Sequence, residues 1–228
     1  MDGIVKRTTR QPFVMFMIGH NRTGKTVLAL DFIKAYKNKF PKKEVIAFDP
    51  QSRIKNAQLG DHYIQKEDWA KYFDPSGELL IHDKLFVLDD YKALMDSDRT
   101  DPDFLRMLML RNEKGLDFLF ITHSPKLIVE RISYYITHYA LFYTYGDSDA
   151  FKSSKKVQNI ETIAQCREFI NAYVKKHDRG SYYEKDENGN DTSKVVKSFP
   201  FAFIDTEEEV ISLINMPKAD INNHKINF

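Results

Sequence analysis

One eight-residue segment of this chain has the residue types and the spacing of a phosphate-binding loop. It reads Gly19-His20-Asn21-Arg22-Thr23-Gly24-Lys25-Thr26 and matches the pattern G-x-x-x-x-G-K-S/T. In such a loop backbone N–H groups surround the phosphates, the lysine reaches the terminal phosphates, and the following hydroxyl ligates Mg²⁺. We therefore expect these eight residues and Val27 to bind a nucleoside triphosphate, with Thr26 as a metal ligand.

A pair of acidic residues could complete this site. Asp89 and Asp90 follow the apolar run 85–88, and a buried strand that ends in an acid is the arrangement that triphosphate hydrolases use to hold magnesium. Asp89 would bind the metal opposite Thr26, and Asp90 would act as the general base that polarises the attacking water. As an alternative, Asp90 caps the helical segment 91–94. The two roles are compatible.

Thr122 and His123 end another apolar run, 116–122. A polar side chain at that position can contact the γ-phosphate or the lytic water, and we name His123 as a candidate catalytic residue. The alternative is an ordinary histidine at the end of a strand, satisfied by a hydrogen bond.

These residues follow short apolar strands that alternate with helices. Strands are expected at 13–18, 44–48, 85–88, 116–122 and 136–145, and helices at 27–38, 66–73, 103–112 and 126–132. This alternation predicts an α/β fold with a mostly parallel central sheet flanked by helices. In a sheet of this type, strand 116–122 lies between the strand before the glycine loop and the strand before the acidic pair.

The last third of the sequence has a different pattern. We expect a basic connector at 152–157, a helix at 160–177, a hairpin formed by 181–185 and 195–204 around the polar turn 186–191, a helix at 207–215 and a tail at 217–228. We therefore divide the chain into a nucleotide-binding core, 1–150, and a small C-terminal α/β cap, 151–228, packed on it.

Composition narrows the possible functions. With 34 basic and 33 acidic residues the net charge is +1, so contact with nucleic acid must come from a local patch. The single cysteine, Cys166, excludes an internal disulfide framework and a cysteine-based zinc site. The apolar runs are shorter than a membrane span and the N-terminus lacks a signal-peptide core, so we expect no membrane association and a cytoplasmic location.

Several of these segments together resemble the FtsK–HerA superfamily of DNA-pumping ATPases. The similarity covers about residues 12–146. It consists of the glycine loop, the strand ending in Asp49-Pro50, the segment 87–95 with its acidic pair, and the segment from Arg111 through Gly115 to Thr122-His123-Ser124-Pro125. It implies the P-loop NTPase fold of the RecA-like (ASCE) type. The chain departs from the family at three positions, with Asp90 for Glu, His123 for Gln, and Arg22 where many such loops carry Gly.

The resemblance also implies partners. ATP would bind between subunits of a homo-oligomeric ring, a pentamer or hexamer, and an arginine from one subunit would complete the neighbour's site. Arg111 matches that arginine best, Arg106 and Arg131 are the other candidates, and an ion pair of Arg111 near Glu113 is the alternative reading.

Within the superfamily the compact chain is most similar to viral (phage) genome-packaging ATPases. This implies double-stranded DNA as substrate, a capsid portal or vertex protein as docking partner, and a location in the host cytoplasm or the virion. The candidate DNA-contacting segments are 96–101 with Arg99, 51–55 with Arg53 and Lys55, and 152–156.

Other functions remain open at this point. One alternative is another P-loop ATPase that acts on nucleic acid, such as a helicase loader, a plasmid transfer protein or a Zot-like phage assembly protein. A nucleotide kinase is less well supported, because no basic lid segment follows the core and Asp89-Asp90 suits water activation better. A nucleotide-dependent scaffold with little turnover is the fourth reading, kept open by the shorter acid, Asp90.

Overall fold

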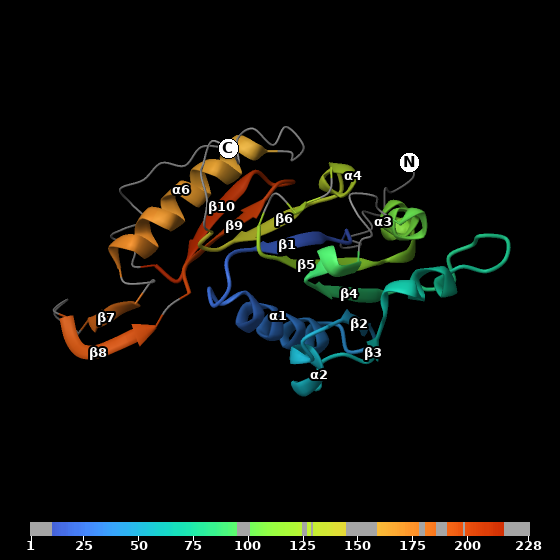
Figure 1. Cartoon of the computed structure of the whole chain (residues 1–228), viewed down its shortest axis with the longest axis horizontal. Coiled ribbons are helices and arrows are strands. Elements are labelled where there is room, and N and C mark those ends of the chain that lie inside the picture. The colour runs from blue at the N-terminus through green and yellow to red at the C-terminus, as the bar shows by residue number, and fades with distance from the viewer. Residues whose placement is uncertain are drawn as a thin grey trace, which may run out of the picture.

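The main element of the fold is a twisted, mostly parallel sheet (Figure 1). The computed structural model describes residues 11–94, 101–124, 127–128, 130–144, 159–177, 181–185, 191–197 and 199–216. Among these residues eight strands form one sheet in the order β10-β9-β6-β1-β5-β4-β2-β3. In chain order they are β1 (Val14–Ile18), β2 (Glu44–Phe48), β3 (His62–Tyr63), β4 (Lys84–Asp89), β5 (Asp117–Thr122), β6 (His138–Leu141), β9 (Phe201–Asp205) and β10 (Val210–Ile214).

The strand order confirms the predicted α/β class. β5 pairs in parallel with β1 on one side and with β4 on the other, so the strand ending in Thr122 lies between the loop strand and the acidic strand. β6, β1, β5, β4, β2 and β3 run parallel to one another. Because the carboxyl ends of parallel strands meet at one edge, the glycine loop, Asp89 and His123 lie at the same edge of the sheet.

Helices cover both faces of the sheet (Figure 1). α1 (Lys25–Lys39) and α2 (Arg53–Asn56) pack on the face that receives the side chains of Met15 and Met17. The opposite face, with Phe16, is covered by the 3₁₀ helix η1 (Lys66–Tyr72), α3 (Pro102–Lys114), α4 (Glu130–Ser133) and α6 (Ile160–Lys176). All five residues of β1 are buried, as expected of a strand covered on both faces.

Local sequence explains where the main helices begin and end. α3 begins at Pro102 after Asp101, whose carboxylate accepts the N–H groups of Asp103 and Phe104, and it ends at Gly115 with a φ of 67°. α1 begins after Gly24 and ends before Phe40-Pro41. The sequence therefore predicted the ends of these helices to within a few residues.

A buried carboxylate joins three elements at the amino edge of the sheet. Asp117 is fully buried. Its Oδ1 accepts the N–H of Phe13 at 3.0 Å, its Oδ2 accepts the hydroxyl of Tyr36 at 2.5 Å, and Lys43 Nζ lies 3.6 Å from Oδ2. Because a buried charge is costly unless it is paired and hydrogen-bonded, these contacts fix β5 against β1 and α1.

The C-terminal third departs from the prediction in two places. The hairpin is present, but its second strand is β8 (Asp191–Lys197), which pairs with β7 (Ser181–Lys185). Residues 201–205 instead form β9, which pairs antiparallel with β6 in the main sheet. The helix predicted at 207–215 is wrong. A turn follows Asp205, whose carboxylate accepts the N–H groups of Glu207 and Glu208, and the chain returns as β10 beside β9.

α6 is attached to the sheet through a buried polar cluster. Arg167 is 3% exposed and donates from Nε to Thr144 Oγ1 at 2.6 Å, while Asn171 accepts the N–H of Thr144 and donates to its carbonyl. The expected domain boundary at 150, the connector at 152–157 and the tail at 217–228 lie outside the described residues. In the described part of the chain we find no helix with the length and apolarity needed to cross a bilayer.

Candidate nucleotide-binding site

The glycine loop connects the end of β1 to the start of α1 and is tied to the neighbouring strands. The N–H of Gly19 donates to the carbonyl of Thr122 at 3.2 Å, and the N–H of His20 donates to the carbonyl of Tyr143 at 2.7 Å. A Cβ on Gly19 would come within 2.6 Å of Phe142 Cβ, so glycine is required there. The sheet therefore holds the first half of the loop in place.

Two residues of the loop have left-handed backbone conformations. Gly24 has a φ of 96° and Arg22 a φ of 64°. Glycine adopts such values without strain, whereas another L-residue pays roughly 1–2 kcal/mol. Arg22 stands where many similar loops carry Gly. Its positive φ explains why glycine is preferred there. Its exposed side chain borders the cleft formed by the loop.

Lys25 is folded back over the loop. Its side chain is buried, and Nζ donates to the carbonyls of Gly19 at 2.6 Å and His20 at 2.8 Å. Burial lowers the pKa of Lys25 to about 8, and the positive charge of Arg53 acts in the same direction, while Asp89 and Asp90 oppose the shift. A phosphate in the loop would supply an anionic partner for this buried ammonium group.

Asp89 brings a buried carboxylate to the same edge. It ends β4 and is 5% exposed, and its Oδ2 has no hydrogen-bond partner among the described residues. Burial raises the pKa of Asp89, the nearby Asp49 carboxylate adds to the rise, and the Arg53 cation opposes it. A buried oxygen without a partner is costly, and a hard cation is a suitable partner for it. Asp89 and Thr26 therefore fit a magnesium site.

Asp90 is half-buried and follows β4 directly, with a φ of 53°. Its backbone carbonyl accepts the N–H of Ala93 at 2.8 Å and so begins the 3₁₀ helix η2 (Tyr91–Leu94). Its charge acts on Lys25, Asp89 and His123. The carboxylate of Asp90 thus belongs electrostatically to the site at the end of β4.

His123 lies beside the lysine, as expected for a residue at the end of the middle strand. Its Nδ1 is 3.5 Å from Lys25 Nζ. Burial lowers the pKa of His123, and the charge of Lys25 lowers it further, so the ring is neutral near pH 7. When Nδ1 accepts a hydrogen bond from Lys25, the ring proton of the neutral imidazole is on Nε2, which is then a donor. The preceding Thr122 is buried, and its hydroxyl lies 3.5 Å from the carbonyl of Ser124.

Three residues that the sequence did not assign to nucleotide binding, Gln51, Arg53 and Phe199, also line the cleft. The cleft has a volume of about 520 Å³ and is lined by Asn21, Arg22, Thr23, Gly24, Lys25, Thr26, Val27, Gln51, Arg53 and Phe199. Arg53 donates from Nη1 to Thr26 Oγ1 at 2.8 Å. Phe199 packs on Gly24 so closely that a Cβ there would be 2.4 Å from its Cγ. The local sequence does not identify Phe199 as a residue of the cleft, because Phe199 reaches the loop only through the pairing of β9 with β6.

Arg111, the residue named for a role in trans, lies far from the loop of its own chain. It is near the C-terminal end of α3, next to the amino ends of the strands. Its guanidinium lies over the Tyr135 ring at 5.4 Å, and its Nη1 donates to the carbonyl of Leu108 at 3.2 Å. Nε is buried without a partner in the described part of the chain. Of the other candidates, Arg106 lies over Phe73 at 5.3 Å and Arg131 is exposed on α4.

Of the three expected DNA-contacting segments, only 51–55 can be placed. Arg99 and residues 152–156 lie outside the described residues. Lys55 is exposed on α2, whereas Arg53 is hydrogen-bonded to Thr26 in the cleft formed by the glycine loop.

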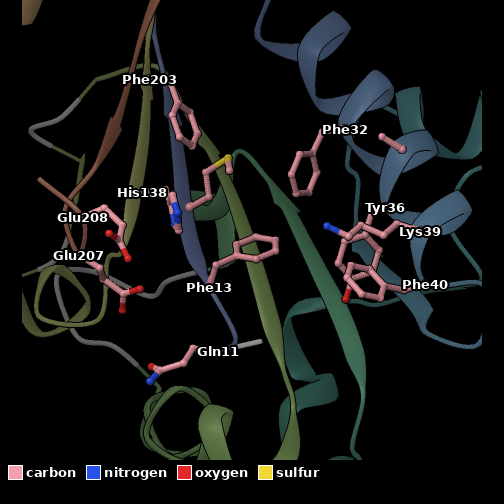
Figure 2. Close-up of a pocket in the computed structure, with 12 residues that line it drawn as sticks. Gln11, Phe13, Phe32, Tyr36, Lys39, Phe40, His138, Phe203, Glu207 and Glu208 are labelled. Atoms are coloured by element: carbon pink, nitrogen blue, oxygen red, sulfur yellow. The ribbon is translucent and has the colours of Figure 1, made fainter. Parts of the chain in front are cut away.

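A larger hollow of about 810 Å³ lies on the α1 face of the sheet, beside the C-terminal half of α1 (Figure 2). Phe13, Phe32, Phe203 and His138 line it, with Glu207 and Glu208 at one side. It lies next to the amino ends of β1 and β6, away from the loop N–H groups and Lys25. Because phosphates need those groups, the loop cleft is a better candidate for a nucleotide than this hollow.

Solved structures with the same fold are known, although no protein-family model and no curated protein sequence matches the chain. The genome-packaging NTPase B204 of Sulfolobus turreted icosahedral virus 2, solved with ATP-gammaS, aligns over 89% of this chain and 96% of its own, with 12% identity and a TM-score of 0.58. B204 of Sulfolobus turreted icosahedral virus, described as a DNA-packaging ATPase, aligns over 90% and 98%, with 15% identity and a TM-score of 0.56.

A more distant similarity is to the type VII secretion ATPase EccC of Thermomonospora curvata. It covers 89% of this chain and 23% of the solved cytoplasmic domain of EccC, with 12% identity and a TM-score of 0.50. At these identities the similarities show a shared fold. That fold is the P-loop ATPase fold, with an eight-stranded, mostly parallel sheet flanked by helices.

Proposed function

We propose that this chain is a magnesium-dependent ATPase that moves double-stranded DNA and packages a viral genome into its capsid. In this assignment residues 19–27 bind ATP, with Lys25 on the terminal phosphates, and Thr26 and Asp89 hold Mg²⁺. Bound Mg²⁺ would supply positive charge to the triphosphate oxygens. The observation that carries the proposal is the convergence of Lys25, Asp89 and His123 at the carboxyl edge of β1, β4 and β5.

The remaining residues of the site have roles in hydrolysis. Asp90 accepts a proton from water as the water oxygen attacks the γ-phosphorus, and the bond to the ADP oxygen breaks. Neutral His123 donates from Nε2 to a γ-phosphate oxygen or to the lytic water. Both roles rest on the placement of these residues around Lys25 and Asp89.

We further propose that the working form is a homo-oligomeric ring, a pentamer or hexamer, with Arg111 acting in trans. Arg111 lies near the end of α3 that precedes the amino end of β5, at the opposite edge of the sheet from its own loop, so a role at a triphosphate would require the site of a neighbouring subunit. Mixing subunits tests this: Arg111→Ala and Lys25→Ala subunits are each inactive alone, and activity should return in the mixture. Mixtures that stay inactive at every ratio would exclude Arg111 as the shared residue.

The proposed substrate and partners follow from the similarity to the packaging ATPases of the two Sulfolobus viruses. These are double-stranded DNA and a capsid portal or vertex protein, in the host cytoplasm or the virion. Gene neighbourhood is an independent test, and a major capsid protein gene close by would support packaging.

The direct test is ATP hydrolysis by the full chain with and without long duplex DNA. We expect Mg²⁺-dependent release of phosphate that rises when duplex is added and is absent in Lys25→Ala. Turnover that stays flat over a wide range of duplex concentrations would contradict the translocase assignment and leave a simpler ATPase.

Two other functions are separated by the same assay. Transfer of phosphate to a nucleoside monophosphate would indicate a kinase. ATP binding without turnover would indicate a nucleotide-dependent scaffold, the reading that the shorter acid at position 90 keeps open. A helicase loader, a plasmid transfer protein or a Zot-like assembly protein would hydrolyse ATP without pumping duplex into a capsid.

A further inference from the structure

Arg53 is hydrogen-bonded to Thr26, the residue whose hydroxyl would hold a metal. Its Nη1 donates to Thr26 Oγ1 at 2.8 Å, and this hydroxyl is the one that the loop pattern assigns to Mg²⁺. A guanidinium and a divalent cation repel each other, so they do not share one oxygen at hydrogen-bonding distance. The Thr26 hydroxyl can therefore bind the metal or accept from Arg53, but it cannot do both at once.

The backbone at Arg53 is firmly fixed although its side chain is exposed. The carboxylate of Asp49 accepts the N–H groups of Arg53, Ile54 and Lys55 at 2.7–2.9 Å. Ile54 is 1% exposed and packs under α1. The start of α2 is therefore anchored to the end of β2, and only the long side chain of Arg53 is free to change partner.

The charge of Arg53 is also part of the site. It acts on the pKa values of Lys25, Asp89 and His123, and Arg53 lines the same cleft as Gly24 and Lys25. A guanidinium has five donors in a planar fork that fits two phosphate oxygens at once. The side chain thus has a stronger partner than a hydroxyl whenever a phosphate enters the cleft.

We propose that Arg53 is a nucleotide-binding residue that holds Thr26 in the free protein and transfers to the phosphates when nucleotide binds. This inference rests on the proposed nucleotide site and goes beyond it, because it assigns a second cation of the same subunit to the phosphates. When Mg²⁺ accompanies the nucleotide, Thr26 would hold the metal and Arg53 would give up its hydrogen bond to Thr26. When Mg²⁺ is absent, Arg53 supplies part of the missing positive charge.

The role gives a specific dependence on magnesium. Loss of Arg53 removes a charge-assisted phosphate contact, which corresponds to about a tenfold or greater loss of affinity for metal-free nucleotide. In Mg²⁺ the same variant loses less affinity for the nucleotide. The substitution removes the phosphate contact of Arg53, but it also removes the side chain that competes with the metal for Thr26. The gain in affinity on adding Mg²⁺ should therefore be several times larger in Arg53→Ala than in the wild type.

The test is equilibrium binding of the fluorescent nucleotide N-methylanthraniloyl-ADP in Mg²⁺ and in EDTA. Lys55→Ala is the matched control, since Lys55 is an exposed cation on the same short helix. We expect wild-type binding in both conditions for Lys55→Ala, a magnesium-sensitive loss for Arg53→Ala, and an intermediate result for Arg53→Lys. Thermal melting checks that all variants are folded.

The inference is overturned if Arg53→Ala and Lys55→Ala behave alike, or if Arg53→Ala loses the same factor in Mg²⁺ and in EDTA. It is also overturned if Arg53→Ala binds nucleotide normally but binds duplex DNA more weakly, because Arg53 would then be a DNA-contacting residue. If the wild type binds the nucleotide in neither condition, the proposed nucleotide site itself is wrong, together with the role of Arg53.

Discussion

The lowered pKa of Lys25 makes nucleotide binding depend on pH in a predictable direction. Burial places this pKa at about 8 in the free protein. Phosphates around the ammonium group favour its charged form, so binding raises the pKa again. A nucleotide therefore binds more tightly at pH values where Lys25 already carries its proton, and affinity falls as the pH rises through 8.

The size of the pH effect on nucleotide affinity follows from the shift in the pKa of Lys25. With a free-state pKa of about 8 and a bound-state pKa near the usual value of about 10.4, the charged fraction in the free protein falls from about nine-tenths at pH 7 to about one-tenth at pH 9. Affinity for the nucleotide should then fall about tenfold over this range. Each binding event should take up about 0.1 proton at pH 7 and about 0.9 proton at pH 9.

Isothermal titration calorimetry in pairs of buffers with different ionisation enthalpies measures this uptake directly. Mg²⁺–nucleotide is the titrant, since its phosphates do not titrate between pH 7 and 9. The control is Lys25→Met, which keeps the length of the side chain but cannot bind a proton, and its binding should be weaker and release or take up no proton near pH 8. Equal uptake in wild type and Lys25→Met, or none in either, would refute the assignment of the shift to Lys25.

Three substitutions test other parts of the account. Gly24→Ala should lower the melting temperature, because an alanine at this positive φ costs about 1–3 kcal/mol and the new Cβ meets Phe199. Adding Phe199→Ala should restore only the part of the melting temperature lost to the clash. Full restoration would mean that the positive φ causes no backbone strain. Asp90→Asn should retain ATP binding but lose about 10²–10⁴-fold in turnover, and unchanged turnover would exclude Asp90 as the base. Tyr36→Phe removes the hydroxyl that donates to Asp117 and should lower the free energy of unfolding in urea by about 1.5–3 kcal/mol, whereas a change within error would mean that this buried contact adds no stability.

The core of the fold could be predicted because its signals are local. β1, the glycine loop and α1 follow one another directly, and their apolar runs are buried on both faces of the sheet. The segment 207–215 was mistaken for a helix because its glutamates favour one. Pairing of Val210–Ile214 with β9 overrides that propensity, and such pairing is a tertiary effect that a local pattern does not contain.

Some residues of the candidate site could be predicted from the sequence and others could not, again because a local pattern does not contain tertiary contacts. Lys25, Asp89 and His123 each end or follow a strand, so their meeting follows from the strand order. Arg53 was placed among the DNA-contacting candidates because a basic loop has no local feature that distinguishes DNA from nucleotide. The return of the chain after β2 brings it onto Thr26. Phe199 reaches Gly24 only through the pairing of β9 with β6.

We propose that ATP hydrolysis at this site drives movement along duplex DNA. Displacement of a labelled triplex-forming oligonucleotide from a long duplex measures such movement directly. We expect displacement that requires ATP and Mg²⁺, grows with the length of duplex leading to the triplex, and is lost in Lys25→Ala and Asp90→Asn. Wild-type protein that hydrolyses ATP in the same reaction but leaves the triplex in place at every duplex length would contradict it.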